Sequence, residues 1–267
     1  MFRVNGWRIF ELASKINTIY MLKIRTFRAI DDQPSCKLFA EGHAKVLLDY
    51  GVTKVTSSSS DWFYNPSVYV MIAETADANE VVGGIRIQIA DGKTPLPMER
   101  AISIVDNKVY NLIAKYTSGG TAELCGLWNS KTTAGLGIGS YYLMRAGISA
   151  APALGLTTLF ALCAPHTLKI SVEKGFEVEK SIGKEGTFIY PKLDLVATSI
   201  LIKDLENLPH ALPQERDLIM QLRYEPRLTR IETGPKGDMQ IDYDLSNFNV
   251  EQLAAPLLTC QTADFLS

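Results

Sequence analysis

Gly135, Gly137 and Gly139 alternate with other residues in the run AGLGIG, which lies between a strand-like and a helix-like segment. Glycine lets a ligand approach the backbone closely, and the first amides of a helix have no intrahelical acceptor. These amides and the helix dipole favour an anion, most naturally a phosphate or pyrophosphate. The run is not a Walker loop, because no Gly-Lys-Ser/Thr follows it, and a dinucleotide fingerprint starting at Gly135 would require glycine at Ser140.

Glu123 is a carboxylate in the otherwise apolar segment TAELCGLW, a few residues before the glycine run. If its side chain faces a substrate, partial desolvation will raise its pKa toward the range of a general base. The alternative is a structural glutamate that faces solvent or forms a salt bridge. Cys163 ends its strand without an evident base beside it, so we interpret it as a buried thiol and not as a nucleophile. Cys125 is likewise interpreted as a core residue.

Two strands must hold these groups, and the residue pattern predicts them at 121–128 and 157–163, joined by the glycine run and a helix that ends near Pro152. Such a strand-helix-strand unit places both strands parallel in one sheet, with a right-handed crossover. Further strands are expected at 22–28, 68–75, 81–90, 177–182 and 194–202, and further helices at 34–50, 106–118, 166–174 and 213–224.

The composition narrows the function classes. A chain of 267 residues that is 46% hydrophobic is neither disordered nor fibrous. Its 27 Lys plus Arg and 29 Asp plus Glu give a charge of −2, which argues against nucleic acid or an anionic membrane as a partner. Four cysteines without a CxxC pair and only three histidines argue against a metal site and favour a reduced, cytoplasmic setting.

The predicted organisation is an N-terminal extension at 1–20, a central domain at 21–204 and a C-terminal helix and tail at 205–267. The central domain carries an insertion at 91–120, expected to cover the side of the site where a second substrate would bind. The tail is expected to hold at most one short helix, near 249–255. Charged residues interrupt the extension, so we expect neither a signal peptide nor a membrane anchor there. No uncharged apolar stretch of about 18 residues occurs elsewhere, which predicts no membrane span.

The glycine run and the order of elements around it resemble the GNAT superfamily of acyl-CoA-dependent N-acyltransferases. The family's loop pattern is Arg or Gln, two residues, Gly, any residue, Gly or Ala; Gly137 and Gly139 match it, whereas Ala134 stands at its first position. The resemblance extends from about Leu22 to Lys203. It implies an α/β (α+β) fold with a mixed, mostly antiparallel central sheet, helices on both faces and a central parallel βαβ unit.

The resemblance also implies a donor site for acetyl-CoA or another acyl-CoA, used as co-substrate without a metal. The pyrophosphate would lie on the amides of the glycine run, and the end of the preceding strand would bind pantetheine. The implied donor-site residues are Leu127, Trp128, Asn129, Gly135, Leu136, Gly137, Ile138, Gly139 and Ser140. Glu123 would be the catalytic base, as in the histone-acetylating branch. Ser171 replaces the tyrosine that many members use as the acid.

A weaker resemblance is to the autoinducer synthases and N-acyl amino acid synthases, whose donor is commonly a fatty acyl chain on acyl carrier protein. It rests on Gly83-Gly84-Ile85-Arg86, Leu96-Pro97-Met98-Glu99 and the strand of Glu123. Gly126 stands where that branch has an arginine.

The leading hypothesis is an N-acyltransferase that moves an acyl group, acetyl first, from acyl-CoA to a primary amine of a small molecule or peptide by direct attack in a ternary complex. The alternatives are an acyl-CoA-binding protein without turnover, a fatty acyl transferase that uses acyl carrier protein, and a nucleotide-binding α/β protein that uses NAD or ATP. The sequence leaves the acceptor open, and it leaves the oligomeric state open between monomer and homodimer.

Overall fold

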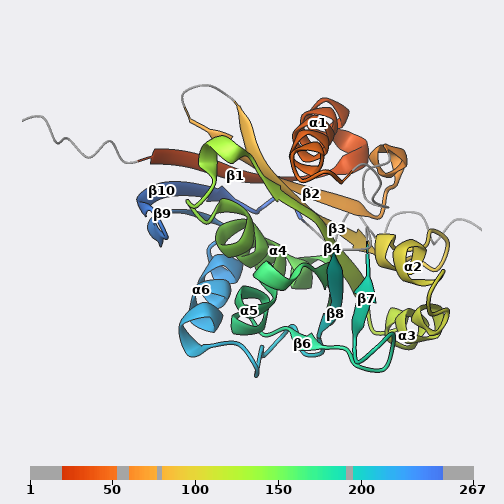
Figure 1. Cartoon of the computed structure of the whole chain (residues 1–267). Coiled ribbons are helices and arrows are strands. Elements are labelled where there is room, and N and C mark those ends of the chain that lie inside the picture. Colours follow the sequence, from red (N-terminus) through yellow and green to blue (C-terminus); the bar gives the residue numbers. More distant parts are fainter. Residues whose placement is uncertain (1–19, 53–59, 77–79, 191–194, 249–267) are drawn as a thin grey trace, which may run out of the picture.

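The computed structural model describes residues 20–52, 60–76, 80–190 and 195–248 (Figure 1). The N-terminal extension before residue 20 and the short helix expected near 249–255 lie outside these residues. In the described part of the chain, ten strands form one sheet in the order β6-β8-β5-β4-β3-β2-β1-β10-β9, with β7 also paired to β8. The strands are β1 (Tyr20–Arg28), β2 (Val68–Thr75), β3 (Val81–Ile89), β4 (Thr121–Asn129), β5 (Thr158–Cys163), β6 (Glu177–Val178), β7 (Thr187–Ile189), β8 (Val196–Ile202), β9 (Arg227–Gly234) and β10 (Gly237–Asp244).

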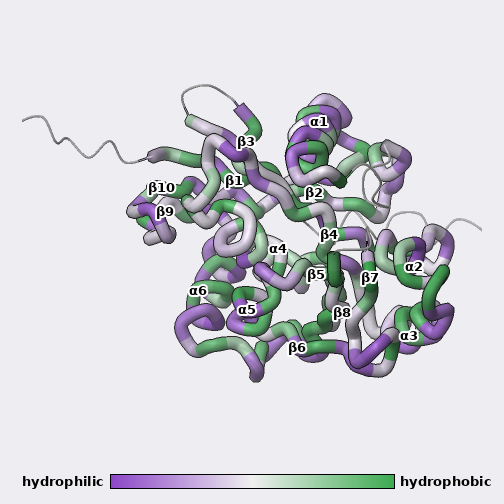
Figure 2. The backbone as a smooth tube through the Cα atoms, in the orientation of Figure 1, coloured by the Kyte–Doolittle hydropathy of each residue, from purple (hydrophilic) through white to green (hydrophobic). Residues whose placement is uncertain are grey.

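Helices cover both faces of the sheet (Figure 1). Alternate residues of one strand enter different cores: Met71 of β2 packs with α4 (Met144–Ala150), α5 (Pro165–Glu173) and α6 (Pro213–Tyr224) on one side. Val70 packs with α1 (Gln33–Asp49) on the other side. The helices of the insertion, α2 (Pro97–Ile102) and α3 (Lys108–Thr117), pack against β5 and β8 in a third cluster on the α1 side. Figure 2 shows β5 and β8 as largely hydrophobic.

The mixed pairing follows the prediction. β4 and β5 run parallel and are joined through α4, and most other neighbours are antiparallel. The expected fold class, a mostly antiparallel sheet with a central parallel βαβ unit and helices on both faces, is therefore confirmed.

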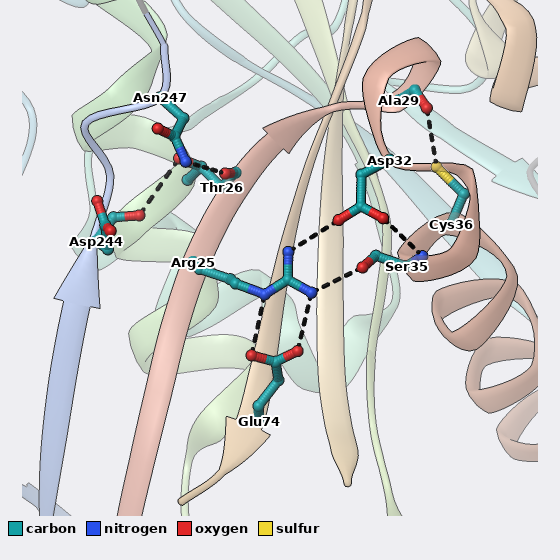
Figure 3. Close-up of polar contacts among 9 residues, drawn as sticks. All are labelled: Arg25, Thr26, Ala29, Asp32, Ser35, Cys36, Glu74, Asp244 and Asn247. Carbon is teal, nitrogen blue, oxygen red and sulfur yellow. Dashed lines mark hydrogen bonds and ion pairs between the residues drawn. The ribbon is translucent and has the colours of Figure 1, made fainter. Parts of the chain in front are cut away.

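Arg25 ties β1 to the start of α1 (Figure 3). Its guanidinium donates two hydrogen bonds of 3.0 Å to Glu74 of β2, one of 3.1 Å to Asp32 and one of 2.7 Å to Ser35. Asp32 also accepts the Ser35 amide at 3.1 Å and so caps the helix. The polar stretch before α1 thus fixes where the helix begins and how it sits on the sheet.

The predicted tail is wrong for residues 227–244. They form the hairpin β9–β10, and β10 pairs in parallel with β1. Met239, Ile241 and Tyr243 are buried while the residues between them are more exposed, so the hairpin adds one half-buried face to the sheet edge.

The predicted strand at 177–182 is shorter than expected, because β6 ends at Val178. Gly183 and Gly186, with φ of 63° and 84°, turn the chain, and β7 follows at Thr187. The insertion contains α2 in addition to the expected helix. Within the described residues, no helix combines the length and apolarity needed to cross a bilayer.

Candidate functional site

A cleft opens where β4 and β5 separate. The two strands pair only from Thr121 with Thr158 to Glu123 with Phe160, although β4 continues to Asn129. Beyond the last pair, residues of both strands line a cleft of about 490 Å³. The backbone of β4 along this edge has no strand partner in the described residues, so its polar groups are available to an extended ligand.

A β-bulge shapes the β4 side of the cleft. Gly84 pairs with Trp128 and Arg86 with Cys125, so Ile85 of β3 faces both Gly126 and Leu127. Gly126 has a φ of 63°, a left-handed conformation that a side chain would strain. A Cβ at Gly126 would also lie 3.2 Å from Nε of the Arg86 guanidinium. The glycine that replaces the arginine of the synthase branch is therefore required by the backbone and by this close packing.

The glycine run forms the turn that enters the helix before α4. Gly135 and Gly137 have φ of 86° and 87°, and a π-helical turn, Ile138–Leu143, leads directly into α4. In the described structure, the backbone amides of residues 137–140 donate to no protein acceptor. The arrangement leaves a set of free N–H groups at a helix start, as an anion site requires.

The structure divides the predicted donor residues into two groups. Residues from the end of β4 and the helix start line the cleft: Leu127, Trp128, Asn129 and Ser140. The other predicted residues form the adjoining turn without lining the cleft: Gly135, Leu136, Gly137, Ile138 and Gly139. Trp128 is also a core residue, packed edge-on against Phe39 of α1.

Glu123 lies at the closed end of the cleft, where the β4–β5 pairing stops, and only 3% of it is exposed. Its Oε2 accepts the Met98 amide of α2 at 2.6 Å. Burial raises the pKa of Glu123 to about 8; the Met98 hydrogen bond and the positive charge of Arg86 oppose this rise, and Glu99 adds to it. The expected pKa shift of a base is therefore present, but the carboxylate lines neither the cleft nor the neighbouring cavity described next.

A second cavity of about 360 Å³ lies on the α1 side of the sheet, and its wall includes Gln88, the β3 residue that pairs with Glu123. Its walls include the aromatic side chains of Trp62 and Tyr64 and the cationic side chains of Arg86, Lys93 and Arg100. The Arg86 guanidinium lies 4.2 Å from the centre of the Trp62 ring, a stacking contact that holds it in place. The insertion supplies part of this wall.

Ser171, which stands at the position of the family's acid, is fully buried and donates its hydroxyl proton to the Thr167 carbonyl at 2.9 Å. His43 of α1 also lines the cleft, and burial and the charge of Arg86 lower its pKa to about 4. It is therefore neutral at neutral pH. Cys125 and Cys163 are buried, as expected, and burial raises the pKa of both thiols.

Sequence reasoning missed the second cavity and the place of His43 in the cleft wall. Trp62 and Tyr64, in the segment DWFY before β2, were the available signal for the cavity, because both line it and Trp62 stacks on Arg86. Within the described residues, no group of three or more His, Cys, Asp or Glu side chains could hold a metal ion.

No family model matches the chain, and no curated protein matches it significantly. Among solved structures, it is similar to FeeM, an N-acyl amino acid synthase from uncultured soil microbes, with 15% identity and a TM-score of 0.53 over 70% of this chain and 99% of that chain. It also matches the acyl-homoserine lactone synthases LasI (18% identity, TM-score 0.49, 70% and 92% covered) and MesI, described as CoA-dependent (16%, 0.48, 73% and 94%). The similarity to FeeM shows a shared fold, which is the GNAT-like fold that the sequence predicted.

Proposed function

We propose that this protein is an acyltransferase that moves an acyl group from a pantetheine thioester, such as acyl-CoA, to a primary amine. The observation that carries the proposal is the cleft between β4 and β5, with the free amides of residues 137–140 beside it. The amides suit the donor's phosphates, and the unpaired edge of β4 suits the extended pantetheine arm. The shared fold with FeeM supports the same reaction class, because FeeM is described as an N-acyl amino acid synthase.

The inner part of the cleft favours an acyl chain longer than acetyl. Apolar side chains from β3, β4, β5, β8, α4 and the segment after α5 line it: Ile85, Leu124, Ala161, Ile200, Met144 and Phe176. Its volume of about 490 Å³ lies in the range of pockets that enclose whole small ligands. We therefore place the acyl chain there, in place of the acetyl group favoured at first, with acetyl as the competing outcome of the test.

The second cavity suits the acceptor. Its three cations, Arg86, Lys93 and Arg100, outnumber its two carboxylates, Asp61 and Asp91, and would bind the carboxylate of a ligand. The rings of Trp62 and Tyr64 would contact an apolar body. A free amino acid combines a carboxylate with the attacking amine. The acceptor class that we propose is therefore an amino acid or a similar amino carboxylate.

The transfer joins these two sites. The neutral amine attacks the thioester carbonyl, the C–S bond breaks, and the departing thiolate takes up a proton. Glu123 lies at the last residue pair between β4 and β5, where the cleft begins, and has a pKa suited to accepting the amine proton. Its carboxylate is covered in the free protein, and catalytic hydrogen bonds commonly form only in the substrate complex. Because the Ser171 hydroxyl is already engaged, solvent would supply the proton to sulfur.

The test measures thiol release from acetyl-CoA, octanoyl-CoA and octanoyl-acyl carrier protein across a panel of amino acids and simple amines. We expect amine-dependent release that is faster with the octanoyl donors. Ala161→Leu, which fills the inner cleft, should lower kcat/KM for octanoyl-CoA at least tenfold while changing acetyl-CoA little; Ala40→Ser, on the half-buried surface of α1, is the control.

Other outcomes assign other functions. Donor binding without amine-dependent thiol release would indicate the binding protein without turnover, which the buried Ser171 hydroxyl favours. Tighter binding of NAD or ATP than of CoA would overturn the acyltransferase in favour of a nucleotide-binding protein.

A further inference from the structure

The turn between β9 and β10 packs directly on the glycine run. The Lys236 ammonium donates a hydrogen bond of 2.6 Å to the Ala134 carbonyl, across 102 residues of sequence. A Cβ at Gly137 would lie 3.3 Å from Cδ of Pro235, and a Cβ at Gly135 would meet the aliphatic stem of Lys236. The C-terminal hairpin therefore forms part of the surface around the anion-binding turn.

The glycine run and the residues beside it, 132–140, include no lysine or arginine. Lys236 contacts Ala134 within this stretch and brings a positive charge to it. An ammonium has three protons to donate, and in the described structure Ala134 O is its one hydrogen-bond acceptor. Lys236 is exposed, so the remaining protons are accessible to a ligand.

A buried network of hydrogen bonds joins the hairpin that carries Lys236 to α4. Glu232 of β9 is buried and accepts hydrogen bonds from Arg145 of α4 at 2.9 Å and from Tyr243 of β10 at 3.1 Å. Arg145 also forms a paired hydrogen bond with Glu215 of α6. Because α4 follows directly from the glycine turn, this network fixes the hairpin to the helix that begins at the anion site.

We propose that Lys236 is a donor-binding residue that contacts a phosphate at the end of the pantetheine arm and supplies the positive charge that the glycine run lacks. The inference rests on the proposed function, because it assumes that the donor carries such a phosphate. The phosphate comes either from the pyrophosphate of CoA or from the single phosphodiester of a carrier protein's phosphopantetheine. Lys236 supplies charge to the free amides of residues 137–140, which supply hydrogen bonds.

The experiment measures the Kd of the full chain for CoA, 4′-phosphopantetheine and pantetheine by calorimetry, with wild type, Lys236→Met and Lys236→Arg. Lys184→Met is the control, because Lys184 is an exposed lysine in another turn and lines neither cavity. We expect Lys236→Met to raise the Kd for CoA about tenfold and to leave the Kd for pantetheine unchanged. Lys236→Arg should stay within threefold of wild type, and Lys184→Met should match wild type.

The phosphate-bearing ligands separate the two sources. A similar rise for CoA and phosphopantetheine places Lys236 on the phosphate that both ligands carry, whereas a rise for CoA alone places it on the phosphates that only CoA has. Unchanged CoA affinity in Lys236→Met would overturn the inference and leave the proposed function standing. An equal loss for pantetheine would also overturn it, because the lysine would then act only on the shape of the turn. A wild-type protein that binds none of the three ligands would overturn the proposed function as well.

Discussion

Glu123→Gln should separate the charge of the buried carboxylate from its shape. Gln keeps a carbonyl oxygen that can accept the Met98 amide, which Glu123 accepts at 2.6 Å, but it cannot ionise. The pKa of Glu123 is raised by burial from 4.5 to about 8. The folded protein therefore holds this proton more tightly than the unfolded chain does, and its stability falls as pH rises from 4.5 to about 8.

The size of the stability change follows from the pKa shift of Glu123. Each pH unit inside this window costs the wild type about 1.4 kcal/mol of unfolding free energy, so the loss between pH 6 and pH 8 is about 2 kcal/mol. Glu123→Gln lacks this term, and its stability relative to the wild type should rise by the same amount over that interval. Above pH 8 both chains should follow parallel curves, because Glu123 is then ionised in the folded and unfolded states alike.

The assay is urea unfolding at pH 6, 7 and 8, followed by the fluorescence of the buried Trp62 and Trp128. A stability difference between the two chains that stays constant within about 0.5 kcal/mol from pH 6 to pH 8 would contradict the pKa assignment.

Steady-state kinetics test the catalytic role of the same residue. The turnover number of Glu123→Gln should fall by roughly 10²- to 10⁴-fold with donor affinity nearly intact, and the acidic limb of the pH–rate profile should flatten. Turnover within about threefold of wild type, with an unchanged limb, would rule out the catalytic role.

Three further changes test the donor site and its support. Gly139→Val should raise the Kd for CoA more than about tenfold without unfolding the protein, because its Cβ would meet Asn129 Oδ1 at 2.9 Å beside the free amides; calorimetry checks this, with Gly119→Ala as control. Glu232→Gln should cost about 3 kcal/mol of unfolding free energy by leaving Arg145 with one carboxylate partner instead of two, measured by urea unfolding. Ending the chain at Pro226 removes the β9–β10 hairpin and the burial of three large side chains, roughly 6 kcal/mol, so this chain should not fold cooperatively in a thermal scan.

The local parts of the fold could be predicted because local rules decide them. The strands around the glycine run have apolar runs of the right length, and α1 begins at the capping residue Asp32, so both followed from the sequence. The β9–β10 hairpin did not, because its strands alternate buried and polar residues over only eight positions and read as a solvated segment. Its strand character depends on pairing with β1, at the other end of the chain.

Only the local part of the candidate site could be predicted. The glycine turn and Glu123 could be found because they lie in one continuous strand-turn-helix stretch of the sequence. The stacking of Trp62 on Arg86 and the contact of Lys236 with Ala134 join segments far apart in sequence, and no periodicity reports such contacts. The pKa of Glu123 likewise depends on α2, whose Met98 amide reaches across 25 residues to the carboxylate.

The hydrogen bond from Met98 to Glu123 gives the insertion at 91–120 a structural role besides covering one side of the site. An insertion that only covered an acceptor could be replaced by a short linker with the rest of the site intact. Here the insertion contributes Leu96, Met98, Ile102, Val109 and Ile113 to a core with Phe160 of β5, the residue that pairs with Glu123. Replacing 94–117 with a linker would therefore expose this core, remove the Met98 hydrogen bond and open the end of the cleft together. The insertion therefore forms part of the proposed acceptor wall and also buries the candidate base. Selective changes at this site must be made at single side chains such as Arg100, which lines the cavity without belonging to that core.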